Sequence, residues 1–452
     1  GGKWNYTGST ASTNRCATLY KETALGVDNS AAILNLNGAF TGAGNFVVDG
    51  NGIVRPGSAK FFSYTGNTIV KSGTLQLEYI KNMTAKSRVY LGEEGNTSPK
   101  LVMAGGNFVT KSSNDQYLNY EFPIEVLENT YSTFTIQRNC SLKCKVTGSG
   151  TLEYKIPFVR EYVSGDWSGF YGTLVANGVN SNKDGSQLML YNSGIPNASI
   201  NLKGNARVTH WNPNVTIKLG GLSGDKGTYL GGTTKKTTGQ TVTWQVGNAN
   251  TNETFNGVID RRCSASGYNC NVNIVKEGSG YWRLTGSNTY NGTTIVTGGR
   301  LIIDGSNQGT GLMTIKENGS LSGKGTIAGD VVVSGSVQAD LSASGSCQPL
   351  TIKGKLTANN ATLVINMEDV TGTIADDTEI KVFNLASAIQ GTGFTDIQPA
   401  TPSATQLWDT SLLATKGIIK VVSNVANGIS TPSADNSSSS AIYDLTGKKT
   451  SS

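Results

Sequence analysis

The chain consists of short apolar segments separated by turns rich in Gly, Asn, Ser and Thr. Between Gly278 and Gly305 the apolar residues occur singly or in groups of two or three, without the three-to-four-residue spacing of a helix. Such segments predict strands, in which alternate side chains face opposite sides. We expect Ile295 and Leu301 to point inward, and Thr294 to face water.

The apolar segments recur at a regular interval. Copies of an apolar–turn–apolar pattern begin at Ile295, Ile315, Val332 and Ile352, which are 20, 17 and 20 residues apart. This period fits one coil of a strand solenoid and is too short for a repeat of paired helices. Coils would stack about 4.8 Å apart, so that each strand pairs with its counterparts above and below. The pattern predicts an all-β fold, a single elongated parallel β-helix.

The pattern also divides the chain into regions. Residues 1–200 predict β-helix coils with irregular loops, and residues 201–375 predict more regular coils. Longer apolar segments in residues 376–422 predict strands that cap the last coils, because an uncovered coil would expose unpaired strand edges. Residues 423–452 contain a polar low-complexity linker with too little apolar surface to order itself, followed by a short tail.

Composition narrows the class of protein. Charged residues make up 15% of the 452 residues, and there are 57 glycines. No run of about 18 apolar residues occurs, so a membrane-spanning helix is not expected. The net charge is +6, but the basic residues are scattered instead of forming a stripe, so we expect no nucleic-acid partner.

The cysteines and the single histidine bear on metal sites. Two local cysteine pairs, Cys140 with Cys144 and Cys263 with Cys270, have spacings that could close small disulfide loops in an oxidising compartment. A Cys/His zinc site needs more histidines than the single His210. We therefore expect no metal and no cofactor.

One segment resembles a known family. Residues 276–305 read KEGSGYWRLTGSNTYNGTTIVTGGRLIIDG, and this is similar to the passenger-associated repeat of bacterial autotransporters, with its GxGxLxLTGxNTYxGxTxVxxGxLxV pattern. The similarity extends over residues 201–422 and is looser before them. It implies a right-handed β-helical shaft, export to the outer surface of a Gram-negative bacterium, and attachment through flanking segments. Family members range from adhesins to proteases and lyases, so the resemblance does not name an activity.

The C-terminal tail resembles a second group of proteins. Ile442–Lys449 read IYDLTGKK, which is similar to the IYDLxGRK sequence near the C-termini of many surface and secreted proteins of Bacteroidetes. This resemblance implies an exported protein of Bacteroidetes type.

Candidate catalytic residues are few. His210 has no accompanying GxSxG elbow, so a Ser-His-Asp triad is not expected. A β-helical polysaccharide lyase needs carboxylates together with a Lys or Arg base, and Asp260, Arg261 and Arg262 form the best local group. A solvated ion pair is the alternative interpretation of these three residues. We expect a scaffold without catalytic residues, with a β-helical polysaccharide lyase or glycoside hydrolase as the alternative. Further acidic pairs are Asp376–Asp377 and Glu93–Glu94.

Aromatic residues suggest carbohydrate binding, which requires exposed rings with polar groups beside them. Core packing or a loop plug is the alternative. Because loops on a rigid shaft commonly carry function, we expect an adhesin-like surface shaft that binds a polysaccharide or host glycan through lateral loops. The sequence does not determine its oligomeric state. The candidate ligand-binding residues are Tyr162, Trp167, Phe170, Tyr171, His210 and Trp211.

Overall fold

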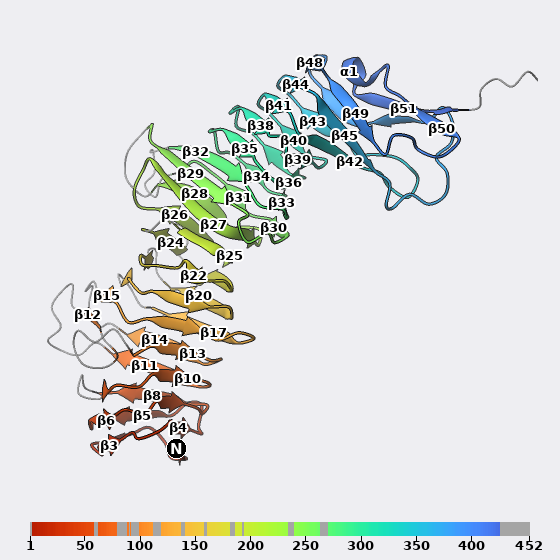
Figure 1. Cartoon of the computed structure of the whole chain (residues 1–452). Coiled ribbons are helices and arrows are strands. Elements are labelled where there is room, and N and C mark those ends of the chain that lie inside the picture. Colours follow the sequence, from red (N-terminus) through yellow and green to blue (C-terminus); the bar gives the residue numbers. More distant parts are fainter. Residues whose placement is uncertain are drawn as a thin grey trace, which may run out of the picture.

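The protein is a stack of coils in which nearly all regular structure is β-strand (Figure 1). The computed structural model describes residues 2–57, 62–78, 88–89, 91, 99–111, 119–136, 141–157, 161–180, 186–191, 194–233, 239–262 and 270–424. Strands of successive coils pair in parallel and form three ladders along the stack, and within the described residues no helix joins one coil to the next. The parallel β-helix predicted from the apolar repeat is confirmed.

The first ladder contains β1 (Lys3–Tyr6), β4 (Thr23–Val27), β7 (Phe46–Val48), β10 (Thr68–Val70), β13 (Leu101–Met103), β16 (Ile124–Val126), β19 (Val146–Gly148) and β22 (Gly169–Phe170). The same face of the stack continues with the first halves of two long strands, β25 (Gly194–Gly204) and β27 (Val215–Gly224). It then passes through β29 (Thr241–Val246), β32 (Asn271–Lys276), β35 (Thr294–Val296), β38 (Met313–Ile315), β41 (Val331–Val333), β44 (Leu356–Ala358) and β48 (Gln390–Gly391).

The second ladder contains β2 (Ala11–Thr13), β5 (Ile33–Leu36), β8 (Ile53–Pro56), β11 (Thr74–Glu78), β14 (Asn107–Lys111), β17 (Tyr131–Thr135), β20 (Thr151–Ile156) and β23 (Thr173–Gly178). It continues through the second halves of β25 and β27. The remaining strands are β30 (Glu253–Phe255), β33 (Tyr281–Leu284), β36 (Gly299–Ile303), β39 (Gly319–Ser322), β42 (Ser336–Asp340), β45 (Ala361–Asn366) and β49 (Phe394–Gln398).

The third ladder is made of shorter strands and is interrupted in places. It contains β3 (Ala17–Thr18), β6 (Phe40–Gly42), β9 (Phe62–Tyr64), β12 (Arg88–Val89), β15 (Asn119–Tyr120), β18 (Ser141–Leu142), β21 (Glu161–Val163) and β24 (Ser186–Leu190). Later strands are β26 (Ala206–His210), β28 (Tyr229–Thr233), β31 (Val258–Ile259), β34 (Ser287–Asn288), β37 (Ser306–Asn307), β40 (Thr326–Ile327), β43 (Leu350–Ile352) and β47 (Phe383–Leu385).

The inward side chains of all three ladders form one continuous apolar core. In the stretch from Gly278 to Gly305, the prediction that Ile295 points inward and Thr294 faces water was wrong. Val296, and not Ile295, pairs with Ile315, so Val296 is fully buried and Ile295 faces outward. The inward position before Val296 is taken by Thr294, whose hydroxyl lies 2.7 Å from the phenol oxygen of buried Tyr290. A polar residue is accepted inside because Tyr290 satisfies its hydrogen bond.

Asn288 closes a gap in the third ladder. Between β31 and β34 the backbone N–H of Thr289 donates to the Ile259 oxygen at 2.9 Å, and the Oδ1 of Asn288 accepts a second hydrogen bond of 2.9 Å from the Ile259 N–H. Asn288 is fully buried. In the next coil the Nδ2 of Asn307 donates to the Tyr290 hydroxyl at 3.0 Å. The Asn-Thr-Tyr turn is therefore a part of the core.

The C-terminal end carries a separate antiparallel sheet. It consists of β46 (Glu379–Lys381), β51 (Ile418–Ser423) and β50 (Gln406–Asp409), and a short helix α1 (Leu413–Lys416) precedes β51. These elements fall in residues 376–422 except for Ser423, the last residue of β51, but β47, β48 and β49 in the same range still pair in parallel with the solenoid. The Ile442–Lys449 segment lies outside the described residues. Within the described ranges, no helix has the length and apolar character needed to cross a bilayer.

The stack changes direction near β24 to β27 (Figure 1). Here β25 and β27 each run straight through the position where other coils turn from the first ladder to the second. β25 also crosses residue 200, so the ladders are continuous between the looser and the more regular part of the repeat.

Candidate functional site

Two of the predicted ligand-binding residues are in the core. Trp167 is 1% exposed and Phe170 is fully buried, and their rings meet edge to face with centroids 5.8 Å apart. A ligand on the outside of the coil does not reach either ring. For these two residues the structure agrees with the alternative of core packing.

A second group of predicted residues meets on the third ladder. Tyr191, which the sequence analysis missed, stacks on Trp211 with centroids 5.4 Å apart, and its other neighbour is Tyr162, also at 5.4 Å. Tyr191 follows β24, whose register with β21 and β26 brings the three rings together. Because the rings are 29 and 20 residues apart in the chain, no local spacing indicates this contact. His210 is 3% exposed, with Nδ1 2.9 Å from the carbonyl oxygen of Asn212.

Tyr171 differs from all of these residues because its ring is 65% exposed. It lies in the turn between β22 and β23, on the ridge where each coil passes from the first ladder to the second. The ring stands at the edge of an open hollow of about 450 Å³. The hollow is lined by hydroxyl, amide and backbone groups from Ser149, Tyr171, Gly172, Thr173, Asn197, Ser199, Asn248, Ala249 and Thr251.

The hollow exists because two coils lack the ridge turn. In β25 the strand continues through a register shift between Ile195 and Ser199, and in β27 it continues through Gly220 and Gly221. The ridge is therefore recessed at these coils, whereas the preceding coils carry turns at residues 149–150 and 171–172. A recess between turns gives a concave site without a separate domain.

A loop from a later coil closes the other side of the hollow. Residues 247–252, between β29 and β30, reach back over β27 to β25. The Nδ2 of Asn248 donates to the backbone oxygen of Pro196 at 3.1 Å and to Oδ1 of Asn197 at 2.9 Å. The backbone N–H of Ala249 donates to the oxygen of Gly220 at 2.9 Å. We call residues 247–252 the strap.

Two of the lining hydroxyls are bonded to a carboxylate, that of Glu253, which is not itself among the lining residues. Oε1 of Glu253 accepts hydrogen bonds from the hydroxyls of Ser199 at 2.5 Å and Thr251 at 2.9 Å. A Cβ on Gly221 would lie 2.7 to 2.8 Å from these same three side chains, so the cluster needs a glycine there. The site therefore combines an exposed ring, hydroxyls, amides and one acceptor carboxylate, which suits a ligand rich in hydroxyl groups.

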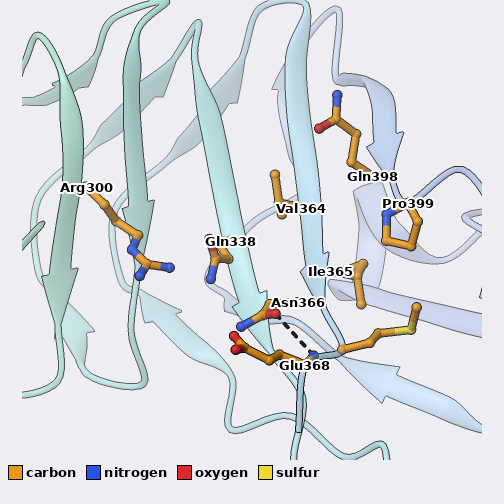
Figure 2. Close-up of a pocket in the computed structure, with 9 residues that line it drawn as sticks. Arg300, Gln338, Val364, Ile365, Asn366, Glu368, Gln398 and Pro399 are labelled. Carbon is orange, nitrogen blue, oxygen red and sulfur yellow. Dashed lines mark hydrogen bonds between the residues drawn. The ribbon is translucent and has the colours of Figure 1, made fainter. Parts of the chain in front are cut away.

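A second hollow, of about 660 Å³, lies on the outer face of β42, β45 and β49 near the C-terminal cap (Figure 2). The amides of Gln338 and Asn366 both donate to Oδ1 of Asp340, at 2.6 and 2.9 Å, and the amide of Gln398 donates to Asp396 at 2.8 Å. Its amide donors thus already have partners, and no aromatic ring is among its lining residues. We therefore take the Tyr171 hollow as the candidate functional site.

The predicted catalytic group forms an ion-pair cluster. Asp260 is 3% exposed, and its carboxylate accepts hydrogen bonds from Arg207 at 3.0 Å and from Nε of Arg262 at 2.7 Å. Both guanidinium groups also lie over the ring of Tyr229, 4.4 and 5.1 Å from its centroid. The neighbouring Arg261 is exposed. The Arg207–Asp260 pair is a buried bridge between coils, whereas the Arg262 side chain is 59% exposed, so its pair with Asp260 is partly solvated.

The acidic pair Asp376–Asp377, a further candidate from the sequence, is already engaged in hydrogen bonds and an ion pair. Asp376 accepts a hydrogen bond from the amide of Gln406 at 2.7 Å, and Asp377 pairs with Lys420 at 2.6 Å. Glu93–Glu94 lie outside the described residues. In the part of the chain that the structure describes, no group of three or more His, Cys, Asp or Glu side chains is placed to hold a metal ion.

The predicted disulfide of Cys144 with Cys140 is wrong, because Cys144 is a free thiol. The pairing of Cys270 with Cys263 stays a prediction, because Cys263 lies outside the described residues, as does Cys140. Cys144 and Cys270 are both buried. The Sγ of Cys144 lies 2.9 Å from the backbone oxygen of Tyr120, and burial is the main cause that raises the pKa of this thiol.

Comparison with known protein families finds one repeat family in this chain. The Passenger-associated-transport-repeat family matches residues 58–77 and 274–303. The chain carries the autotransporter passenger repeat. The second match contains Asn288 and Tyr290, whose side chains are buried hydrogen-bonding groups of the core. The passenger repeat thus describes the shaft, and it does not include the residues of the Tyr171 hollow.

Two relatives are similar over short stretches. The Adhesin BmaC autotransporter of Brucella suis biovar 1 (strain 1330) is 49% identical over 61 residues, which are 13% of this chain and 2% of that protein. The Uncharacterized protein YuaQ of Escherichia coli (strain K12) is 36% identical over 109 residues, or 23% of this chain and 7% of that protein. The chain therefore spans a small fraction of either relative.

Proposed function

We propose that this chain is the shaft of an exported, adhesin-like surface passenger and that it binds a glycan in the Tyr171 hollow. The observation that carries the proposal is the exposed Tyr171 ring beside a hollow lined by hydroxyls and amides. Sugars present both apolar ring faces and hydroxyl groups, so an aromatic surface next to fixed hydrogen-bonding groups suits them.

The passenger repeat at two separate places in the chain supports export to the outer surface of a Gram-negative cell. Similarity to an autotransporter adhesin supports an adhesin-like role over an enzymatic one. We further propose that segments flanking this sequence attach it to the cell, and that the IYDLTGKK segment marks a Bacteroidetes-type protein.

A panel of plant and host glycans tests the proposal, with binding and the appearance of new reducing or unsaturated ends measured on the same samples. We compare the unmodified chain with Tyr171→Ala. Tyr20→Ala is the matched control, because Tyr20 is 85% exposed and lies outside the hollow.

We expect at least one glycan to bind the unmodified chain and the Tyr20→Ala variant equally. Tyr171→Ala should weaken that binding about tenfold, or ~1.4 kcal/mol. The absence of binding to every glycan, or unchanged binding by Tyr171→Ala, would refute the glycan site. Turnover of a glycan would refute the scaffold and favour the lyase or hydrolase alternative.

A further inference from the structure

The Tyr171 hollow is one end of a longer track along the solenoid. On the outer face of the second ladder, Tyr131, Thr151, Thr173 and Ser199 occupy one register column in four successive coils. Gly221 follows Ser199 in the same column, beneath the Glu253 cluster. The column therefore leads from an exposed tyrosine through three hydroxyls to the carboxylate of the hollow.

A second exposed ring stands at the far end of this column. Tyr131 is 53% exposed and begins β17, two coils before β23, whose preceding turn carries Tyr171. Two coil steps of about 4.8 Å separate the two ring positions by about 10 Å along the axis. Leu127, on the ridge next to Tyr131, is also 38% exposed. Exposed large apolar residues thus accompany the track at its start and at the hollow.

Glu153 lies near the Tyr131 end of the track. The pKa of Tyr131 is raised, first by burial and then by the charge of and hydrogen bond with Glu153. Glu153 is itself 8% exposed and accepts a hydrogen bond of 2.6 Å from Nδ2 of Asn177.

The charges along the track select the kind of chain that fits. Carboxylates lie at both ends, with Glu128 in the ridge turn before Tyr131, Glu153 near Tyr131 and Glu253 bonded to Ser199 beside the hollow. A polyanion lying on the column would meet like charge at each end, since the outward lysines of the same strands, Lys155 and Lys203, lie four residues further along β20 and β25. A neutral chain of sugars meets rings, hydroxyls and hydrogen-bond acceptors instead.

We propose that the track from Tyr131 to Asn248 binds a neutral glycan polymer that runs along the solenoid axis, with one sugar ring on Tyr131 and another on Tyr171. This inference rests on the proposed glycan binding at Tyr171 and adds a direction, a minimum length and a charge class to it. The column from Tyr131 to Gly221 covers four coil steps, or about 19 Å.

The test measures affinity against chain length, by calorimetry with a disaccharide and a hexasaccharide of the neutral polymer that binds in the glycan panel. The unmodified chain should bind the hexasaccharide at least about tenfold more tightly. Tyr131→Ala should remove most of this gain and leave the disaccharide affinity unchanged, whereas Tyr171→Ala should weaken both ligands. Tyr20→Ala is again the control, and circular dichroism establishes that each variant is folded.

A further variant examines the floor of the track. Thr151→Val keeps the shape of the side chain and removes its hydroxyl, so it should weaken the hexasaccharide and not the disaccharide. Thr18→Val, at an exposed position on the third ladder, is its control.

The outcomes separate the two proposals. Equal affinity for both lengths, or a Tyr131→Ala variant that binds the hexasaccharide like the unmodified chain, overturns the track while Tyr171-dependent binding still supports the hollow. Tighter binding of a uronic-acid polymer than of the neutral one overturns the charge argument and with it this proposal. Loss of all glycan binding removes the proposed function itself.

Discussion

Asn248 and Asn197 are hydrogen-bonded to each other across a strand to which neither belongs. Nδ2 of Asn248 lies 2.9 Å from Oδ1 of Asn197, and the strand between their coils is β27. The contact holds the strap against β25 and defines one wall of the candidate site. It is possible because β27 presents two glycines where the strap passes.

Replacing Gly220 with alanine should disturb the packing of β27 against β25 beneath the strap. The new Cβ would lie 2.6 and 2.7 Å from the backbone N and O of Ala198, atoms that cannot turn away as a side chain can. We expect the free energy of unfolding to fall by about 1–3 kcal/mol, the usual cost of overpacking. Chemical denaturation measures the change. Gly2→Ala is the control, since nothing lies within 4 Å of its Cβ position, and equal stability of the two variants would contradict the packing argument.

The Asp260→Asn substitution should lower the free energy of unfolding. Removing one charge from a buried pair leaves Arg207 without its carboxylate partner, and breaking such pairs commonly costs about 3–5 kcal/mol. Thermal and denaturant unfolding check this prediction, with the exposed neighbour Arg261→Ala as the control expected to change little. If Asp260→Asn keeps full stability, the carboxylate does not have the bridging role assigned to it.

Tyr290→Phe tests the buried network of the passenger repeat. The substitution removes the hydroxyl that accepts a hydrogen bond from Asn307 and contacts Thr294, leaving buried polar groups unpaired. The expected loss is about 1–3 kcal/mol of unfolding free energy. Tyr20→Phe, at a position 85% exposed, should be nearly neutral in the same denaturation experiment. Similar losses in both variants would argue against the network.

Glu161 predicts a pH dependence of stability. It is fully buried, neither of its carboxyl oxygens has a hydrogen-bond partner within the described ranges, and burial raises its pKa well above the usual value. Between the unfolded pKa near 4.3 and the raised folded pKa, the folded chain binds one more proton than the unfolded chain. The Glu161 contribution to stability should therefore be greatest at acidic pH and decline as pH rises through this window.

Glu161→Gln should remove that decline and be the more stable protein at neutral pH. Denaturant unfolding of both proteins between pH 4 and 9 gives the two slopes. Glu368→Gln, which changes an exposed carboxylate, should keep the slope of the unmodified chain. A Glu161→Gln variant with the same pH slope as the unmodified chain would show that Glu161 is not the group responsible.

Part of the candidate site was predictable and part was not. Tyr171 was among the residues expected to bind a ligand, because an aromatic-rich stretch between glycines suggested a lateral loop. The same stretch also contained Trp167 and Phe170, which the coil buries. Tyr131, Asn197 and Asn248 were missed. A strand that begins with Tyr where the next two coils begin with Thr was the available signal for Tyr131, but the strap contact at Asn248 has no local signature.

The amino-acid sequence by itself determined the coil. Apolar segments recurring about every 20 residues, with glycine and asparagine between them, require strands and turns that stack on their own copies, because that arrangement buries the repeated face of every coil. The tertiary structure decided which ring faces water and which coil is recessed. Those properties depend on the register between strands and on contacts such as Asn248 with Asn197, which are 51 residues apart. A one-residue shift, as between Ile295 and Val296, exchanges inside and outside while leaving the sequence period unchanged.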